Sequence, residues 1–381
     1  MTMSRFSFPT LIHFGPGVRS LAPAHLASEG AKRPLVVTDR GVAALPIHGE
    51  LVDLLKKSGL EVASFSGIWG NPVSSQVKAG VEAYRAHGAD SIVGLGGGAA
   101  LDVAKAIALM VHHPGDIFDY EDDKPGARPF DQPIPTWIAL PTTSGTGSEV
   151  GRSSVVSDDV THIKKIIFSP RLLAKAVFAD PELTLDLPPS ITASTGMDAL
   201  THNVESYLAR GFHPICDGIA LEGLRIAAKS LAKAVKDGGD VHARGDMLMS
   251  SMMGAIAFQK GLGVTHSCAH ALGTVVDMHH GLANGVMIDH ALLHNAEGAR
   301  DRFETMARAI GLSDASPQGF LSWLRELKAA ISIPADLTEA GVDAKQLDRL
   351  VDVAVADACH QNNPVACTAD DFRRIFRGAF T

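Results

Sequence analysis

The chain has 381 residues, of which 46% are hydrophobic and 20% charged, so it is long enough for two domains with sizeable apolar cores. Its net charge of −8 argues against nucleic acid or an anionic membrane as the main partner. The four cysteines lack the spacing of a zinc ribbon or a disulfide framework, which favours a reducing cytoplasm. The sequence shows no apolar signal segment in MTMSRFSFPT and no run as long as a membrane span, so we expect a cytoplasmic protein.

The first half of the chain alternates strand and helix patterns. Strands are predicted by short apolar runs at 35–39, 61–66, 91–96 and 136–140, and helices by longer segments at 51–60, 77–89 and 100–111. Strands separated by helices favour a parallel sheet covered on both faces. Such a sheet binds ligands at the carboxyl ends of its strands.

The second half is predicted to be mainly helical. Apolar residues recur at three- and four-residue intervals in 191–208, 217–236, 244–261 and 320–330. Pro188-Pro189 marks the expected boundary between an α/β domain at 1–188 and a helical domain at 189–381. A cleft between two such domains is a usual place for a small-molecule site.

A glycine run lies between the strand at 91–96 and the helix that follows it. In GLGGGA at 94–99, the bare backbone of Gly96, Gly97 and Gly98 can approach a pyrophosphate, and N–H groups at a helix start can hold it. The run also satisfies the dinucleotide-binding pattern G-x-G-x-x-G/A. A tight turn without a ligand explains the same glycines equally well.

Asp39 closes the first predicted strand and is the candidate for binding the adenosine ribose. A carboxylate there can accept hydrogen bonds from the ribose hydroxyls and repels a 2′-phosphate. The dinucleotide pattern would instead place this acid about twenty residues after the glycines, near Asp116 or Asp119. An ordinary turn aspartate before Arg40-Gly41 is equally compatible with the local sequence.

An aspartate and several histidines occur at helical spacing in the second half. Asp198 and His202 are four residues apart, so both side chains project from one face of a helix. His266 and His270 repeat this spacing, and His280 follows them. Carboxylate and imidazole suit a divalent transition metal such as zinc or iron. One such pair is more often a salt bridge, but so many buried rings would each need a metal or a hydrogen-bond partner.

These residues resemble the metal-site signature of the iron-containing (group III) alcohol dehydrogenases. The match lies in Asp198 with His202 and in the pattern H-x3-H-x9-H-G that starts at His266. The resemblance implies one Fe(II) or Zn(II) ion and leaves His270 near the substrate as a catalytic proton handler. The implied metal ligands are Asp198, His202, His266 and His280.

Further segments resemble the nucleotide-binding half of the same family. GGGAALDVAK at 96–105 resembles the family pattern GGGS-x-x-D-x-AK, in which the glycines hold the pyrophosphate. LPTTSGTGSEVG at 140–151 resembles a second signature, although a loop of small residues needs no ligand. By this resemblance an acid at position 39 favours NAD over NADP. The implied cofactor-binding residues are Asp39, Asn71, Gly96, Gly97, Gly98, Asp102, Thr142, Thr143, Ser144, Thr146, Ser148 and Lys164.

The family implies a dehydroquinate-synthase-like architecture, with an N-terminal Rossmann-like parallel-sheet domain for NAD and an all-helical C-terminal domain for the metal. The implied reaction is hydride transfer between nicotinamide and a small alcohol or aldehyde whose oxygen the metal polarises. DGIALEGL and GAIAFQKGLGVTHS are similar to members that interconvert short ω-hydroxy acids and semialdehydes, such as 4-hydroxybutyrate dehydrogenases. By analogy with relatives, we expect a homo-oligomer of at least two subunits.

Three other functions are compatible with parts of the sequence. A maleylacetate reductase-type enzyme would work without metal, which the complete ligand set argues against. A dehydroquinate-synthase-like lyase would need several basic residues for a phosphorylated substrate. A non-catalytic metal-binding protein would not need the cofactor signature. Among the other histidines, we expect His279 to point away from the metal and the following to be surface or core residues: His242, His290, His294 and His360.

Overall fold

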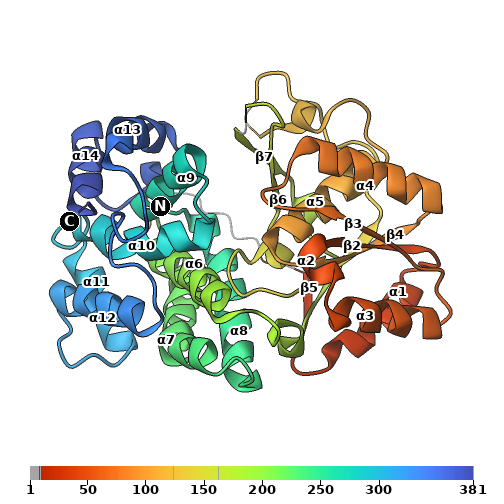
Figure 1. Cartoon of the computed structure of the whole chain (residues 1–381), viewed down its shortest axis with the longest axis horizontal. Coiled ribbons are helices and arrows are strands. Elements are labelled where there is room, and N and C mark those ends of the chain that lie inside the picture. The colour runs from red at the N-terminus through yellow and green to blue at the C-terminus, as the bar shows by residue number, and fades with distance from the viewer. Residues whose placement is uncertain (1–7, 9, 123, 162, 381) are drawn as a thin grey trace. The chain divides into compact units, whose positions relative to one another are not determined.

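The computed structural model describes residues 8, 10–122, 124–161 and 163–380, and these divide into two compact units. The sheet unit contains the described residues of 8–143 and 148–185 (Figure 1). The helical unit contains residues 144–147 and the described residues from 186 onward. The chain thus passes into the helical unit shortly before Pro188-Pro189. The sequence patterns did not assign the segment 144–147 to the helical unit.

A six-stranded parallel sheet forms the centre of the sheet unit, which confirms the predicted α/β class. The strands lie in the order β1-β8-β5-β4-β2-β3, and all neighbours pair in parallel. β4 and β8 are buried along their whole length, as expected for a sheet covered on both faces. The strands are β1 (Leu11–Phe14), β2 (Pro34–Asp39), β3 (Ala63–Ile68), β4 (Ser91–Gly96), β5 (Thr136–Pro141) and β8 (Ala176–Ala179).

Helices cover both faces of this sheet (Figure 1). On one face, Leu26 of α1 and Leu55 of α3 share an apolar cluster with Val36 of β2. On the other, α5 crosses so close to β4 that a Cβ at Gly94 would lie 3.0 Å from Leu101, and α4 packs beside α5. The helices are α1 (Ala22–Ser28), α2 (Arg40–Ala43), α3 (Pro46–Lys57), α4 (Ser74–His87) and α5 (Gly98–Met110). The 3-10 turns are η1 (Val18–Leu21), η2 (Ile117–Tyr120), η3 (Ser148–Val150), η4 (Pro170–Leu172) and η5 (Pro181–Thr184).

The strand order creates a crevice at the carboxyl edge of the sheet. From β2 the chain moves outward to β3 and then returns to β4 on the other side of β2. The helices that follow β2 and β4 therefore cover opposite faces, which leaves a crevice outside the carboxyl ends of these two strands. Asp39 ends β2 and Gly96 ends β4, so both lie at this crevice.

The sheet unit also contains a second, two-stranded antiparallel sheet that is separate from the main one. It consists of β6 (Ser153–Ser157) and β7 (Lys164–Phe168). The sequence patterns did not predict this pair, nor did they predict β1 and β8, which are only four residues each.

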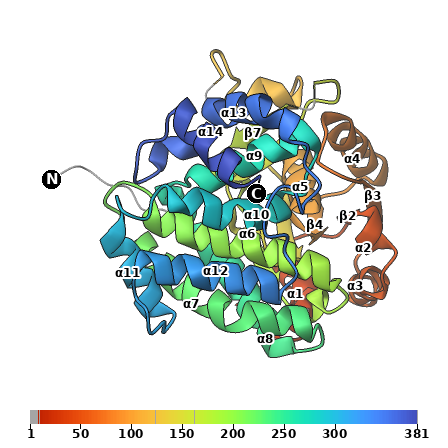
Figure 2. The ribbon, with the colours of Figure 1, turned by 60° about the vertical axis from the view of Figure 1, so that its left-hand side comes forward.

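The helical unit is organised around α6 (Pro189–Leu208), which is buried along most of its length. α6 packs against α7, α8 and α10 (Figure 2). The expected helix at 244–261 ends earlier, because residues 258–260 tighten into a 3-10 turn before Gly261 at φ +126°. The other helices are α7 (Pro214–Lys236), α8 (Val241–Ala257), α9 (Val264–Val276), α10 (His280–Leu293), α11 (Arg300–Ala309), α12 (Pro317–Ala330), α13 (Leu347–Ala356) and α14 (Ala369–Gly378). The 3-10 turns are η6 (Phe258–Lys260), η7 (Ala344–Gln346) and η8 (Cys359–Asn362).

The burial of α6 places several polar side chains in the interior of the helical unit. Asp198, His202, Asn203 and Glu205 are all buried on this one helix. Each buried polar group needs a hydrogen bond or a metal to offset the loss of water. Among the described residues, no helix is both long and apolar enough to cross a membrane.

Candidate functional site

The structure brings the four predicted metal ligands together inside the helical unit. Asp198 and His202 project from adjacent turns of α6, His266 comes from α9, and His280 begins α10. The Nε2 atoms of the three histidines lie, in chain order, 3.9, 3.8 and 3.4 Å from Asp198 Oδ1. Ligand atoms about 2.1 Å from a tetrahedral ion would stand roughly 3.4 Å apart. These distances to Asp198 are close to that spacing, and the ligand atoms of Asp198, His202 and His266 all lie within 4.8 Å of one another.

Burial and charge hold Asp198, His202 and His280 in the protonation state that a metal needs. At His266, burial is outweighed by the hydrogen bond and charge of Glu205, which raise the pKa of that ring. Burial raises the pKa of Asp198, but the neighbouring His202 and His280 outweigh it and hold that pKa well below its ordinary value. Burial lowers the pKa of His202 and that of His280 to about 4, in spite of the Asp198 charge. Near pH 7 Asp198 is therefore ionised while His202 and His280 are neutral, the forms that bind divalent metals. The residues present fit the implied ion.

Asn284 of α10 lies among the ligand atoms. Its Nδ2 donates to Asp198 Oδ1 at 2.8 Å and lies 3.2 Å from His280 Nε2 and 3.4 Å from His266 Nε2. Its side chain is buried, and its Oδ1 has no partner among the described residues. The amide can stabilise the Asp198 carboxylate as a donor or, rotated by 180°, can turn its oxygen toward a cation.

His270 lies one turn after His266 on α9, beside the ligand cluster. Its ring centroid is 5.3 Å from that of His280, and its Nδ1 lies 2.7 Å from Asp357 Oδ2. Asp357 also accepts from Ser267 Oγ at 2.7 Å and from Cys359 N at 2.8 Å. Burial raises the pKa of Asp357, but these bonds and the His270 ring outweigh it and lower the pKa below its ordinary value. An ionised Asp357 keeps a proton on Nδ1 of His270 and leaves Nε2 as the ring nitrogen for proton transfer.

Asp39 and Gly96 adjoin one another at the crevice of the sheet unit. Asp39 Oδ1 caps α2 by accepting from Val42 N at 2.9 Å, while a Cβ placed on Gly96 would lie 3.2 Å from Asp39 Oδ2. Gly96 has φ +150°, a conformation that favours glycine. A carboxylate next to the glycine turn is the arrangement expected for an acid that binds the adenosine ribose.

The start of α5 is suited to hold a pyrophosphate. Gly97 is the N-cap residue, and no side chain in the described part of the chain caps the helix there. The first N–H groups of a helix left uncapped in this way can bind phosphate oxygens. A Cβ on Gly97 would lie 3.1 Å from Thr143 Oγ1, and Thr142 N donates to Gly96 O at 3.0 Å. The glycine turn and the residues that follow β5 therefore lie side by side at the carboxyl edge.

The loop segment 144–147 packs with the helices of its own unit. The carbonyl of Gly145 lies 3.3 Å from His202 Nδ1, so it can accept that N–H and leave Nε2 for a metal. A Cβ on Gly147, which has φ +61°, would lie 2.2 Å from Ala255 of α8. The glycines of this loop thus allow its backbone to approach α6 and α8 closely. Within the loop, Ser144 is buried and Thr146 is exposed.

Asp102 and Ser148 form a polar network within the sheet unit. Ser148 Oγ donates to Asp102 Oδ1 at 2.6 Å and accepts from Lys105 Nζ at 2.7 Å. Asp102 Oδ2 accepts from Val155 N at 3.1 Å. Both carboxylate oxygens therefore bond to the protein itself and connect α5 to η3 and β6. The cofactor contacts of these two residues stay a prediction.

Asn71 and Lys164 occupy different parts of the sheet unit. Asn71 is exposed in the turn after β3, at the same carboxyl edge as the crevice. Lys164 begins β7 and pairs with Ser157 in the small antiparallel sheet, so no strand of the main sheet carries it. Its contact with the cofactor likewise stays a prediction.

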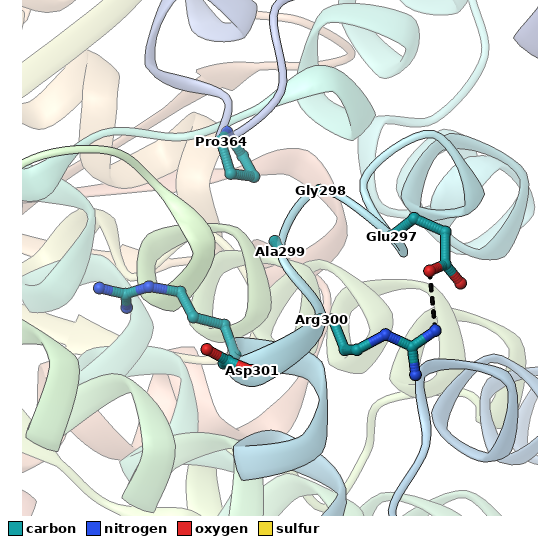
Figure 3. A pocket seen from close by; sticks show the side chains of 7 residues that line it. Glu297, Gly298, Ala299, Arg300, Asp301 and Pro364 are labelled. Atoms are coloured by element: carbon teal, nitrogen blue, oxygen red, sulfur yellow. Dashed lines mark hydrogen bonds and ion pairs between the residues drawn. The ribbon is translucent and has the colours of Figure 1, made fainter.

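A cavity of about 420 Å³ in the helical unit lies where the chain turns into α11 (Figure 3). Three of its charged lining residues pair with protein groups: Arg300 lies 2.7 Å from Glu297, and Arg302 donates to Tyr207 O at 2.6 Å. None of the residues predicted from sequence to bind metal or cofactor lines this cavity. We assign it no function.

Sequence reasoning missed three residues around the ligand cluster: Glu205, Asn284 and Asp357. Glu205 follows His202 by three residues and Asn284 follows His280 by four, but neither spacing indicates which residue the side chain contacts. His279 caps α10 by accepting from Leu282 N at 3.4 Å. Of the four histidines predicted to be surface or core residues, His242 is exposed and the others are half-buried: His290, His294 and His360.

Comparisons with known proteins give matches over nearly the whole chain. The sequence model described as iron-containing alcohol dehydrogenase matches residues 9–181, and the C-terminal model of the same family matches residues 192–380. A 4-hydroxybutyrate dehydrogenase from Cupriavidus necator is 38% identical, with 98% of this chain and 99% of that protein aligned.

Two solved structures extend the similarity to the fold. A 1,3-propanediol oxidoreductase has a TM-score of 0.94 at 33% identity, with all of both chains covered. A sulfoacetaldehyde reductase from Bifidobacterium kashiwanohense in complex with NAD+ has a TM-score of 0.92 at 29% identity, covering 100% of this chain and 99% of that one. The resemblance inferred from the sequence motifs is confirmed: the chain belongs to the iron-containing alcohol dehydrogenase family of oxidoreductases.

Proposed function

We propose that the protein is a metal-dependent, NAD(H)-linked alcohol dehydrogenase or aldehyde reductase that acts on a small alcohol or ω-hydroxy acid. The observation that carries the proposal is the convergence of Asp198 Oδ1 with three imidazole Nε2 atoms in the helical unit. Such a cluster of electron-pair donors has little use without a cation.

The metal site follows from these donors. Asp198, His202, His266 and His280 would hold one Fe(II) or Zn(II), which when bound supplies Lewis acidity to a substrate oxygen. Both ions accept this ligand set, so the ligands alone do not select one.

His270 is the proposed proton handler. Its Nδ1 is bonded to Asp357, so its Nε2 is the nitrogen that can take the hydroxyl proton during alcohol oxidation and return it during aldehyde reduction. The Asp357 carboxylate would stabilise the imidazolium that forms when Nε2 gains a proton.

NAD is the proposed cofactor, bound at the crevice of the sheet unit. Asp39 would accept hydrogen bonds from the adenosine ribose, and the uncapped start of α5 would hold the pyrophosphate. The solved relative in complex with NAD+ supports this choice. Hydride transfer requires the nicotinamide and the substrate carbon to be in contact when both ligands are bound.

For the substrate we infer a short ω-hydroxy acid such as 4-hydroxybutyrate. The inference is supported by the segments 217–224 and 254–267 and by the 38% identity to the protein from Cupriavidus necator. We further propose a cytoplasmic homo-oligomer of at least two subunits. The absence of any disulfide among the four cysteines, all of which are described, supports the reducing compartment.

The test combines metal content with activity on anaerobically purified protein. Plasma mass spectrometry should find about one iron or zinc per chain in the wild type, and the same samples should reduce NAD with 4-hydroxybutyrate, 1,3-propanediol or a simple alcohol. His266→Ala should lose metal and activity together. His242→Ala removes an exposed histidine of the same unit and should keep both.

Each alternative gives a different result. Active wild-type protein without metal would indicate the metal-free reductase type. Consumption of substrate without net NADH formation would indicate a lyase that recycles its cofactor. A clear preference for plain alcohols over ω-hydroxy acids would leave the dehydrogenase in place and remove the substrate assignment.

A further inference from the structure

Glu205 is a buried carboxylate of the helical unit with four hydrogen-bond partners. It is 1% exposed on α6, and its Oε2 lies 2.7 Å from Nδ1 of His266. Three backbone N–H groups at the start of α9 also donate to it: Gly263 at 2.9 Å, Thr265 at 2.6 Å and His266 at 3.3 Å. The carboxylate therefore caps α9 and contacts the ring of a proposed metal ligand at the same time.

These contacts determine which nitrogen of His266 carries the proton. Three backbone N–H groups donate to Glu205, and although burial raises the pKa of this carboxyl, its hydrogen bonds outweigh burial and lower that pKa, so the group is ionised. An ionised carboxylate only accepts, so Nδ1 of His266 must carry its ring proton as the donor. Nε2 is then left with its lone pair, and it is the atom that lies 3.8 Å from Asp198 Oδ1.

We propose that Glu205 is a positioning residue that fixes the Nδ1–H tautomer and the ring orientation of His266, so that Nε2 is ready to bind metal. The inference rests on the proposed metal site and extends it to a residue that touches neither metal nor substrate. Carboxylates that support a metal-bound histidine in this way contribute about 10- to 100-fold in metal affinity.

Asp357 provides a matched control. It makes the same contact one turn further along α9, at 2.7 Å from Nδ1 of His270, and it also binds the Ser267 hydroxyl of α9. The two carboxylates thus support the same helix through comparable hydrogen bonds. His270 is not a proposed metal ligand, so loss of the Asp357 charge removes no hydrogen bond to a ligand ring and should affect metal affinity less than loss of the Glu205 charge.

The experiment measures Zn(II) affinity of the metal-free full-length protein by competition with a chromophoric chelator. In Glu205→Gln the negative charge that faces Nδ1 of His266 is lost and one carboxylate oxygen becomes an NH2 group, so the hydrogen bonds that fix the tautomer and orientation of the ring are weakened. The Zn(II) dissociation constant of this variant should rise about 10- to 100-fold. Asp357→Asn should change it less than about threefold. Circular dichroism of each metal-free variant checks that it is folded.

The outcomes separate this inference from the proposed function. Wild-type protein that binds no Zn(II) would remove the proposed metal site itself. Equal Zn(II) affinities for the wild type and folded Glu205→Gln would overturn the proposed role of Glu205 and leave the proposed metal site in place.

A second measurement does not depend on the variant being folded. Nitrogen-15 NMR of histidine-labelled wild-type protein, with the His266 signals identified by His266→Gln, should show a protonated Nδ1 and an unprotonated Nε2. The opposite tautomer would overturn the inference.

Discussion

Glu149 is expected to make the stability of the sheet unit depend on pH. It lies in η3 with 2% of its surface exposed, and its Oε1 has no hydrogen-bond partner among the described residues. Burial raises the pKa of Glu149 from 4.5 to about 7, although a backbone N–H and the charge of Lys105 act in the other direction. The folded state therefore holds a proton on Glu149 at pH values where the unfolded chain has lost it.

The sign and size of the effect follow from the difference between the pKa of Glu149 in the folded protein and its ordinary value. Because the folded pKa is the higher one, Glu149 is neutral in both states below about pH 4.5, and the folded state loses stability as the pH rises from there through about 7. At about 1.4 kcal/mol per pH unit, the gap corresponds to a loss of about 3 kcal/mol, an upper figure for a single buried carboxyl. A domain of this size shifts its Tm by about 2–4 °C per kcal/mol.

Glu149→Gln removes this titration and keeps the shape of the side chain. The melting temperature should fall by several degrees more in the wild type than in the variant between pH 5 and pH 8.5, as measured by scanning calorimetry at both pH values. Glu50→Gln removes an exposed carboxylate of α3 and should follow the wild type. Parallel Tm profiles of wild type and Glu149→Gln would refute the reasoning, because they would show that the buried carboxyl is not the titrating group.

Two further predictions concern the cofactor and the proton. Asp39→Ser keeps a cap for α2 but loses the carboxylate. In steady-state kinetics the KM for NAD should therefore rise about tenfold or more, and NADP should become a better substrate. An unchanged preference for NAD over NADP would remove Asp39 from the ribose site. His270→Ala should lower kcat by about 10²- to 10⁴-fold while metal content stays near one per chain, and unchanged kcat and pH profile would end its role as proton handler.

Local spacing made part of the site predictable. Asp198 and His202 are four residues apart on α6, and helical geometry alone places them on one face. The carboxyl edge of the sheet was also predictable, because alternation of strands and helices places Asp39 and Gly96 at the carboxyl ends of their strands; that these two strands are neighbours was known only from the structure. His280 joins the cluster only through the packing of α10 against α6 and α9, which family resemblance implied and local pattern could not show.

The supporting residues were beyond the reach of sequence patterns. Glu205 meets His266 across 61 residues and Asp357 meets His270 across 87, so no local spacing signals either pair. Asn284 follows His280 by one helical turn, but an asparagine at that position is as compatible with an exposed helix face. β1 and β8 escaped prediction because four residues are too few to establish an alternation.

Glu205 both caps α9 and contacts the ring of His266, and these two roles constrain how the sequence can change during evolution. A descendant that no longer needed the metal could replace His202 or His280 without leaving a helix start exposed. Replacement of Glu205 by an apolar residue would leave the N–H groups of Gly263, Thr265 and His266 buried without their acceptor, each at a cost of about 1–3 kcal/mol. Glu205 should therefore be replaced more slowly during evolution than the metal ligands, and it should persist in lineages that have lost the metal.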